Sequence, residues 1–177
     1  MSSSTLAQRW WVPCSSADVQ GELDRLCATL RRNRTVYGYL SSEAALVANL
    51  SLLENLWLPH AWRAGWSRRS CLRRLEALFE HCGSLPDPDP DLLNLRDFFF
   101  CRPAQLSPQQ IRQAVILRAA LGQPRVVLID PGWSTWSASM QLLAPAAWLL
   151  VAVDPDPLMT GVTWSNLSPE DARECLR

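Results

Sequence analysis

The segment 106–130, LSPQQIRQAVILRAALGQPRVVLID, constrains the fold of this chain more than any other. Ser107 and Gln110 have the spacing of a capping box, in which each side chain satisfies a backbone N–H group of the other residue. The spacing therefore predicts a helix that begins directly after Ser107. Residues 111–121 are apolar almost all round, so we expect this helix to be buried.

The same segment then predicts a buried strand. Gly122 and Pro124 form a stop signal for the helix. The continuous apolar run Val126–Ile129 follows, and it ends on Asp130. Such runs are typical of parallel sheets that are covered on both faces. A second run of this kind, Trp148–Val153, also ends on an acid, so we expect another strand there.

Strands and helices alternate along the rest of the chain. Further strands are expected at 35–40 and 161–164, and further helices at 17–33, 51–59, 68–82, 91–101 and 168–176. This order predicts an α/β fold, with a largely parallel sheet and helices on both of its faces. We expect a single domain over residues 1–177, with a helical subdomain, 51–105, inserted within it.

Two further expectations concern the N-terminal segment and the end of the helix that opens at Ser51. Residues 1–16 are expected to be irregular, with Trp10 and Trp11 exposed or awaiting a partner. A helix that opens at the capping residue Ser51 is expected to end at Pro59, because proline lacks the N–H group that a helix interior needs.

Composition excludes several classes of function. Seventeen acids balance seventeen basic residues, so no global field points to nucleic acid or to an anionic membrane. The six cysteines and two histidines lack the spacings of a zinc site, and we expect free thiols in a reducing cytosol. No signal peptide is evident, and the longest apolar run, Leu142–Val153, is shorter than the ~20 residues of a spanning helix. We therefore expect a soluble, cytoplasmic protein.

Four landmarks, in the family's own order, resemble the nucleotide-binding ATPase subunit of ABC transporters. They are the strand and helix around the Q-loop (36–46 and NLSLLENLWLP, 49–59), the signature motif (RPAQLSPQQ, 102–110), the Walker B strand (RVVLID, 125–130) and the strand of the switch histidine (149–156). The resemblance implies a truncated, ABC ATPase-like P-loop NTPase fold over about residues 35–175. The LENLWLP stretch is most similar to lipid-importing members, including those that work with MCE proteins.

The resemblance also implies a set of site residues. Ser42 takes the position of the Q-loop glutamine, and Ser107 and Gln110 keep the polar positions of the signature motif. These three residues are the expected nucleotide contacts. Asp130 takes the Walker B position, which in the family acts on magnesium through water. It is the expected metal contact, with capping of a neighbouring loop as the alternative.

The groups that the family uses for phosphoryl transfer are replaced. The chain has no lysine, and no two of its seven glycines have the spacing of a G-x-x-x-x-G phosphate-binding loop. The N-terminal Walker A lobe is therefore expected to be shortened or missing. Pro108 and Gln109 replace the signature glycines, Pro131 stands at the catalytic glutamate, Ser137 at the dimer-interface aspartate, and 153–156 lacks the switch histidine. We expect no catalytic residue and no hydrolysis of ATP.

These replacements favour a degenerate, non-hydrolysing ABC-type ATP-binding subunit. It would act as a structural or regulatory partner in a membrane transport complex, with lipid as a candidate cargo. Its expected partners are a transmembrane permease subunit, a complete ABC ATPase, or both, and its expected location is the cytoplasm, peripheral to the inner membrane. No cofactor is expected for the isolated chain, and ATP with magnesium would bind only with a partner subunit.

Two alternatives remain open at this point. The chain could be a weak ATP-binding or ATPase subunit that is completed by a partner's P-loop facing the LSPQQ segment. It could also be a regulatory adaptor or membrane-surface protein outside transport. The face that would touch anionic lipid is rich in arginine and contains Arg63, Arg68, Arg69, Arg73 and Arg74.

Three tryptophans of the helical insert, Trp57, Trp62 and Trp66, have two possible roles. Aromatic residues are enriched at interfaces, so these side chains could contact a permease. Packing in the core is the other interpretation. Trp62 and Trp66 are expected to lie one helical turn apart.

Overall fold

The computed structural model describes residues 8–41, 46–82, 95–133, 138–154 and 164–176. The chain divides into two compact units. The sheet unit contains residues 1–43, 123–136 and 143–177, and the helical unit contains residues 44–122 and 137–142. Each unit is described separately below.

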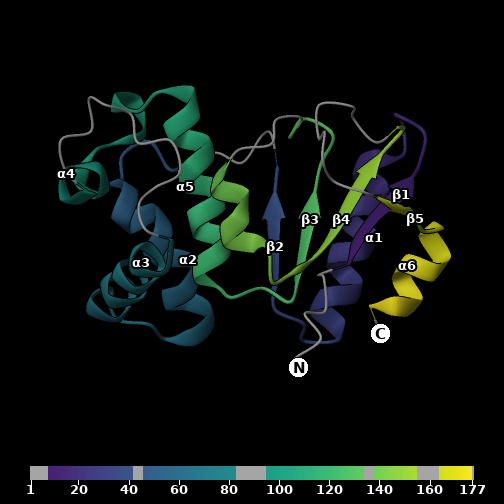
Figure 1. The fold of residues 1–177 in the computed structure, drawn as a ribbon, viewed down its shortest axis with the longest axis horizontal. Coiled ribbons are helices and arrows are strands. Elements are labelled where there is room, and N and C mark those ends of the chain that lie inside the picture. The colour runs from purple at the N-terminus through teal and green to yellow at the C-terminus, as the bar shows by residue number, and fades with distance from the viewer. Residues whose placement is uncertain (1–7, 42–45, 83–94, 134–137, 155–163, 177) are drawn as a thin grey trace. The chain divides into compact units, whose positions relative to one another are not determined.

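The sheet unit is built on a five-stranded sheet in which every strand pair is parallel (Figure 1). The strand order is β2-β3-β4-β1-β5. The strands are β1 (Arg9–Pro13), β2 (Tyr37–Leu40), β3 (Val126–Ile129), β4 (Ala147–Ala152) and β5 (Ser165–Asn166). All four residues of β3 are buried, as its apolar run predicted. The α/β fold with a parallel sheet is therefore confirmed.

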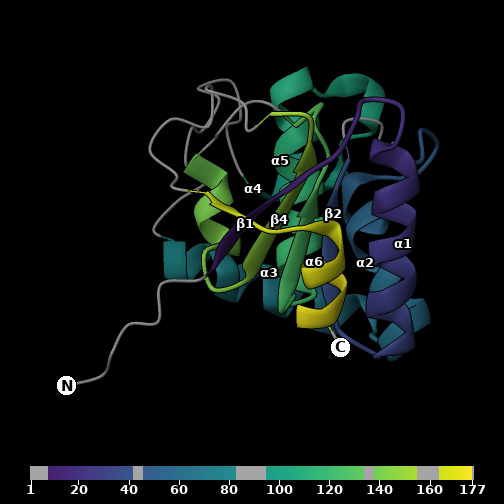
Figure 2. The ribbon, with the colours of Figure 1, turned by 90° about the vertical axis from the view of Figure 1, so that its right-hand side faces the viewer.

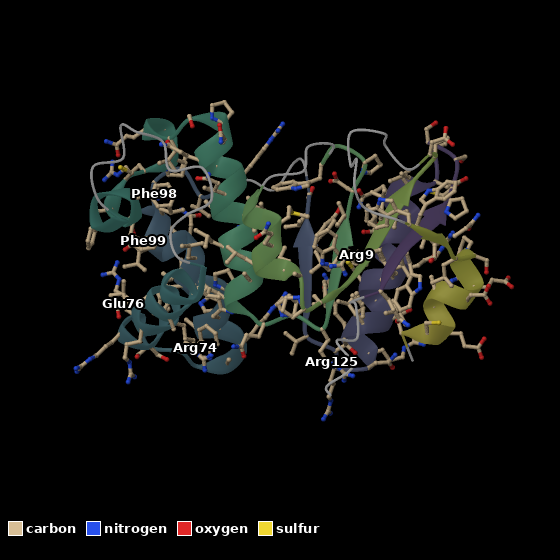
Figure 3. All side chains as sticks on the ribbon, in the orientation of Figure 1. Arg9, Arg74, Glu76, Phe98, Phe99 and Arg125 are labelled. Atoms are coloured by element: carbon tan, nitrogen blue, oxygen red, sulfur yellow. The ribbon has the colours of Figure 1, made fainter. Side chains whose placement is uncertain are left out.

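The expectation of an irregular N-terminal segment, 1–16, is wrong for 9–13, because β1 lies inside the sheet between β4 and β5. Val12 is fully buried, and the indole N–H group of Trp11 donates to the carbonyl of Ala152 at 3.0 Å. The guanidinium of Arg9, labelled in Figure 3, lies 3.9 Å from the ring centre of Trp148. Tryptophan and valine favour strands, so the sequence of 9–13 already contained a signal for a strand. Pairing with β4, far along the chain, is what makes this segment a strand of the sheet.

Two helices, α1 (Val19–Arg32) and α6 (Pro169–Cys175), pack on the sheet (Figure 2). They share a hydrophobic core with one face of it. From α1 and α6 come Leu23, Leu26, Cys27, Leu30, Ala172 and Leu176, and from the strands come Val12, Val126, Leu128, Leu149 and Val151. Ser168 caps α6 by accepting the N–H group of Asp171 at 3.1 Å, as the sequence predicted. The expected strand at 161–164 falls mostly outside the described residues, and β5 follows it.

The helical unit contains α2 (Leu52–Ala64), α3 (Arg68–Cys82), α4 (Leu95–Phe100) and α5 (Pro108–Leu121). Short 3-10 turns occur at Pro103–Gln105 and Ala138–Leu143. The predicted bounds of α3 and the predicted start of α5 are confirmed. The first residues of the helix expected at 91–101 lie outside the described residues. None of the described helices is long and apolar enough to cross a membrane.

The expectation that α2 ends at Pro59 is wrong. The helix continues to Ala64 and ends at Gly65, which has a left-handed φ of 64° and donates its N–H group to the carbonyl of Ala61 at 3.0 Å. Proline removes only one helical hydrogen bond, and the turns after it are stabilised by this glycine cap. Trp66 therefore lies beyond the helix, and not one turn from Trp62.

Candidate functional site

Polar residues of the sheet unit follow the strands at the carboxyl edge of the parallel sheet. Leu40 of β2 and Ile129 of β3 are paired in register, so Ser41 and Asp130 follow adjacent strands. The N–H group of Asp130 donates to the carbonyl of Leu40 at 3.1 Å, which extends the ladder by one residue. In open α/β sheets, ligands bind outside this edge.

Asp130 is only 7% exposed at the end of β3. Its carbonyl accepts the N–H group of Trp133 at 3.1 Å, which closes a turn over the exposed Pro131. Burial raises the pKa of Tyr39, a hydrogen bond with Ser41 lowers it, and the negative charge of Asp130 raises it. A carboxylate is therefore present where a cation contact was predicted. Ser42, the predicted Q-loop contact, lies outside the described residues.

A loop, Cys14–Asp18, connects the carboxyl end of β1 to the N-terminus of α1. Cys14 leaves the sheet with its N–H group bonded to the carbonyl of Ala152 at 3.2 Å. The hydroxyl of Ser15 donates to the carboxylate of Asp18, and the N–H group of Asp18 donates back to the carbonyl of Ser15 at 3.0 Å. A loop between a strand and a helix N-terminus is the position at which many α/β proteins hold phosphate.

The residues of this loop do not fit a phosphate group. Asp18 stands at the N-cap position of α1 without a side-chain capping bond, and Glu22 lies in the first turn, so two carboxylates stand near the helix terminus that would attract an anion. Burial raises the pKa of Cys14, and the charges of Glu22 and Asp18 raise it further, which keeps the thiol neutral near pH 7. The loop contains no cationic side chain, and the chain has no lysine to supply one. A phosphate bound there would meet the exposed carboxylate of Asp18, whereas the charge of the buried Glu22 is paired with Arg25 and Arg173.

The signature segment forms the capping box that its sequence predicted. The hydroxyl of Ser107 accepts the N–H group of Gln110 at 3.2 Å, and the Gln110 side chain accepts the N–H group of Ser107 at 2.8 Å. The structure thus brings these two predicted nucleotide contacts together, because the two capping hydrogen bonds join Ser107 to Gln110. Pro108 has no N–H group, so the first turn of α5 offers few donors to an anion.

Asn55 is a functional candidate that sequence reasoning missed. It is 4% exposed in α2, and its side-chain oxygen accepts the N–H group of Val47 at 2.6 Å. Its amide donates to the carbonyls of Val47 at 3.1 Å and Ser51 at 3.0 Å. One side chain therefore fixes the segment that leads into α2. The available signal was an asparagine on the apolar helix face between Leu52 and Leu56.

Two of the three tryptophans are engaged inside the helical unit. The indole N–H group of Trp57 donates to the carbonyl of Trp66 at 2.7 Å. The Trp66 ring stacks on His60 with ring centres 4.6 Å apart, and the guanidinium of Arg74, labelled in Figure 3, lies 4.3 Å from its centre. Trp62, in contrast, is 88% exposed. Of these three side chains, only Trp62 has most of its surface exposed.

No family model matches the sequence. The structure of an ATP-binding subunit of an ABC transporter is 18% identical and aligns over 80% of this chain and 66% of its own, with a TM-score of 0.56. The dimeric structure of a bacterial ABC transporter cassette is 21% identical and aligns over 93% of this chain and 84% of its own, with a TM-score of 0.54. The chain has an ABC ATPase-like fold. This likeness is one of fold, and the chain spans 66% of the first of these structures.

Replacing Ser107 with alanine should destabilise the protein by about 1 kcal/mol, because α5 loses its N-cap. Ser107→Asp keeps an accepting oxygen at the same place and should retain most of the stability. Urea unfolding followed by circular dichroism measures both changes. If Ser107→Ala unfolds at the same urea concentration as the wild type, the capping role is wrong.

Alkylation of Cys14 by iodoacetamide should be slow at pH 8, because a raised pKa leaves little thiolate. The rate should rise with pH, with a midpoint above the ordinary thiol value of about 8.5. Asp18→Asn removes one negative charge, so it should lower this midpoint and accelerate the reaction. Peptide mass spectrometry measures the rate, and Asp24→Asn, further along α1, serves as the matched control. Equal rates in the two variants would contradict the influence of Asp18.

Proposed function

We propose that this chain is a non-hydrolysing, ABC-type subunit that acts as a structural or regulatory partner in a membrane transport complex. The single observation that carries the proposal is the β1–α1 loop. It occupies the position at which α/β proteins hold phosphate, but it presents Asp18 and the nearby Glu22 instead of a lysine. The ABC ATPase-like scaffold is thus combined with a loop that disfavours nucleotide phosphates.

The state of the signature segment supports the same proposal. Ser107 and Gln110 bond to each other in the capping box, and Pro108 removes a backbone donor from the helix terminus. With this donor removed, the first turn of α5 offers less to a nucleotide phosphate, which favours a scaffold role over the alternative of a weak ATP-binding subunit.

The proposed partner is a transmembrane permease subunit, alone or together with a complete ABC ATPase. The exposed ring of Trp62 is the anchor that we assign to this contact, because large aromatic residues dominate the energetics of interfaces. Asn55 fixes the segment at the start of the same helix. The similarity of LENLWLP to lipid-importing members makes lipid the proposed cargo, and the cytoplasmic side of the inner membrane the proposed location.

Calorimetry of the isolated chain with ATP should show no magnesium-dependent binding. The physical reason is the repulsion between the nucleotide phosphates and the carboxylates beside the β1–α1 loop. Asp130→Asn should leave the titration unchanged. Magnesium-dependent binding that Asp130→Asn abolishes would overturn the non-binding part of the proposal and would favour a weak ATP-binding subunit.

The tagged chain, purified from membranes of its native cell after mild cross-linking, should carry a permease with several membrane spans, identified by mass spectrometry. Trp62→Ala should reduce this recovery about tenfold, as expected for an interface anchor. Val36→Ala, which removes an apolar side chain 51% exposed in the sheet unit, should leave it unchanged. Recovery of the chain without any permease would contradict a transport role.

A further inference from the structure

A groove lies between α1 and α6 in the sheet unit. Its volume is about 430 Å³, which lies within the range of small-molecule sites. The groove is lined by Arg25, Ala28, Thr29, Arg32, Asn33 and Arg173. Three of these residues are arginine, and none is acidic.

The arginines face the groove because of helical spacing. Arg25 and Arg32 are seven residues apart, so they lie two turns from each other on one face of α1. Thr29 lies between them on the same face, and its hydroxyl donates to the carbonyl of Arg25 at 3.0 Å. Arg173 reaches the groove from α6. A ligand in the groove would therefore meet guanidinium groups from two helices.

A buried carboxylate holds two of these arginines in place. Glu22 has a side chain only 4% exposed, with one oxygen 3.0 Å from Nη1 of Arg25 and the other 3.6 Å from Nε of Arg173. The Nε group of Arg173 also donates to the carbonyl of Pro169 at 2.8 Å. Both contacts of Arg173 with the described residues use Nε, which leaves its Nη groups for a ligand. Three guanidinium groups against one carboxylate give the groove a surplus of about two positive charges.

Backbone carbonyls at the C-terminal end of α1 are hydrogen-bonded within the chain. The carbonyls of Thr29, Leu30 and Arg31 accept the N–H groups of Asn33, Thr35 and Arg34 at 3.0, 2.9 and 3.1 Å. The side-chain amide of Asn33 donates to the carbonyl of Leu176 at 2.7 Å, which ties the end of α6 to α1. The walls of the groove are thus held together before any ligand arrives.

We propose that this groove binds a dianionic phosphate group, such as a diphosphate or a phosphomonoester. The planar guanidinium forms paired hydrogen bonds with phosphate oxygens, and several such groups around one cavity suit a ligand with more than one charged oxygen. The site is separate from the nucleotide position of the fold and goes beyond the proposed function. The phosphate can belong to a free metabolite or to a lipid headgroup, and the two sources are distinguished below.

The test is calorimetry of the full chain with pyrophosphate in magnesium-free buffer that contains EDTA. These conditions exclude a metal-dependent site at Asp130, so the result is independent of the nucleotide experiment. We expect saturable binding that weakens as salt is added, because the arginines are partly exposed. Arg32→Gln should weaken it about tenfold, as expected for loss of one charge-assisted contact. Arg32→Lys should give an intermediate affinity.

Arg69→Gln in α3 is the matched control, since it makes the same change of charge at an exposed arginine outside the groove. Its affinity for pyrophosphate should equal that of the wild type. Flotation with phosphatidylcholine vesicles that contain phosphatidic acid tests the lipid source. Binding that pyrophosphate displaces and Arg32→Gln weakens would assign the groove to a headgroup, and pyrophosphate binding alone would assign it to a free ligand. Absence of saturable binding to both probes, or equal losses in Arg32→Gln and Arg69→Gln, would overturn the proposal.

Discussion

The parallel pairing of β1 with β4 is the interaction on which the sheet unit depends. It joins residues near the start of the chain to residues near its end, in register from Arg9 with Trp148 to Pro13 with Ala152. Parallel neighbours cannot be joined by tight turns, so helices must cross over the sheet between them. The helix α1 follows β1 and leads to β2, three places away in the sheet, and its apolar face forms the core with the strands. The same pairing fixes where the β1–α1 loop emerges at the carboxyl edge.

The position and the charge of the β1–α1 loop have different origins. Its position follows from strand order and from the start of α1, and both are properties of backbone and core. Its charge follows from two side chains, the exposed Asp18 and the buried Glu22. Asp18 and Glu22 bring negative charge to the helix terminus, and Glu22 uses its carboxylate to hold Arg25 and Arg173. A group beside the usual anion position thus organises a cationic groove between α1 and α6.

The helical unit depends on polar groups that close its helix ends. Ser51 with Glu54 and Ser107 with Gln110 form capping boxes at the starts of α2 and α5, and Asn55 bonds the segment before α2. Because the backbone of these ends is satisfied locally, the helices do not need a bound nucleotide to order them. The exposed indole of Trp62 then remains as a surface feature without an internal role in the described residues.

Local patterns in the sequence determined the capping boxes, the amphipathic α3 and the buried strand β3, because each depends on residues a few positions apart. They also placed Asp130 at the end of a strand and Ser107 with Gln110 at a helix terminus. Tertiary structure alone decided that 9–13 forms an inner strand, that α2 continues past Pro59 and that Asn55 fixes the preceding segment. It also decided that Arg25, Arg32 and Arg173 share a groove. Each of these features depends on contacts that the local sequence does not specify. Hydrophobic periodicity and helix start and stop signals describe only residues that are close together in the chain.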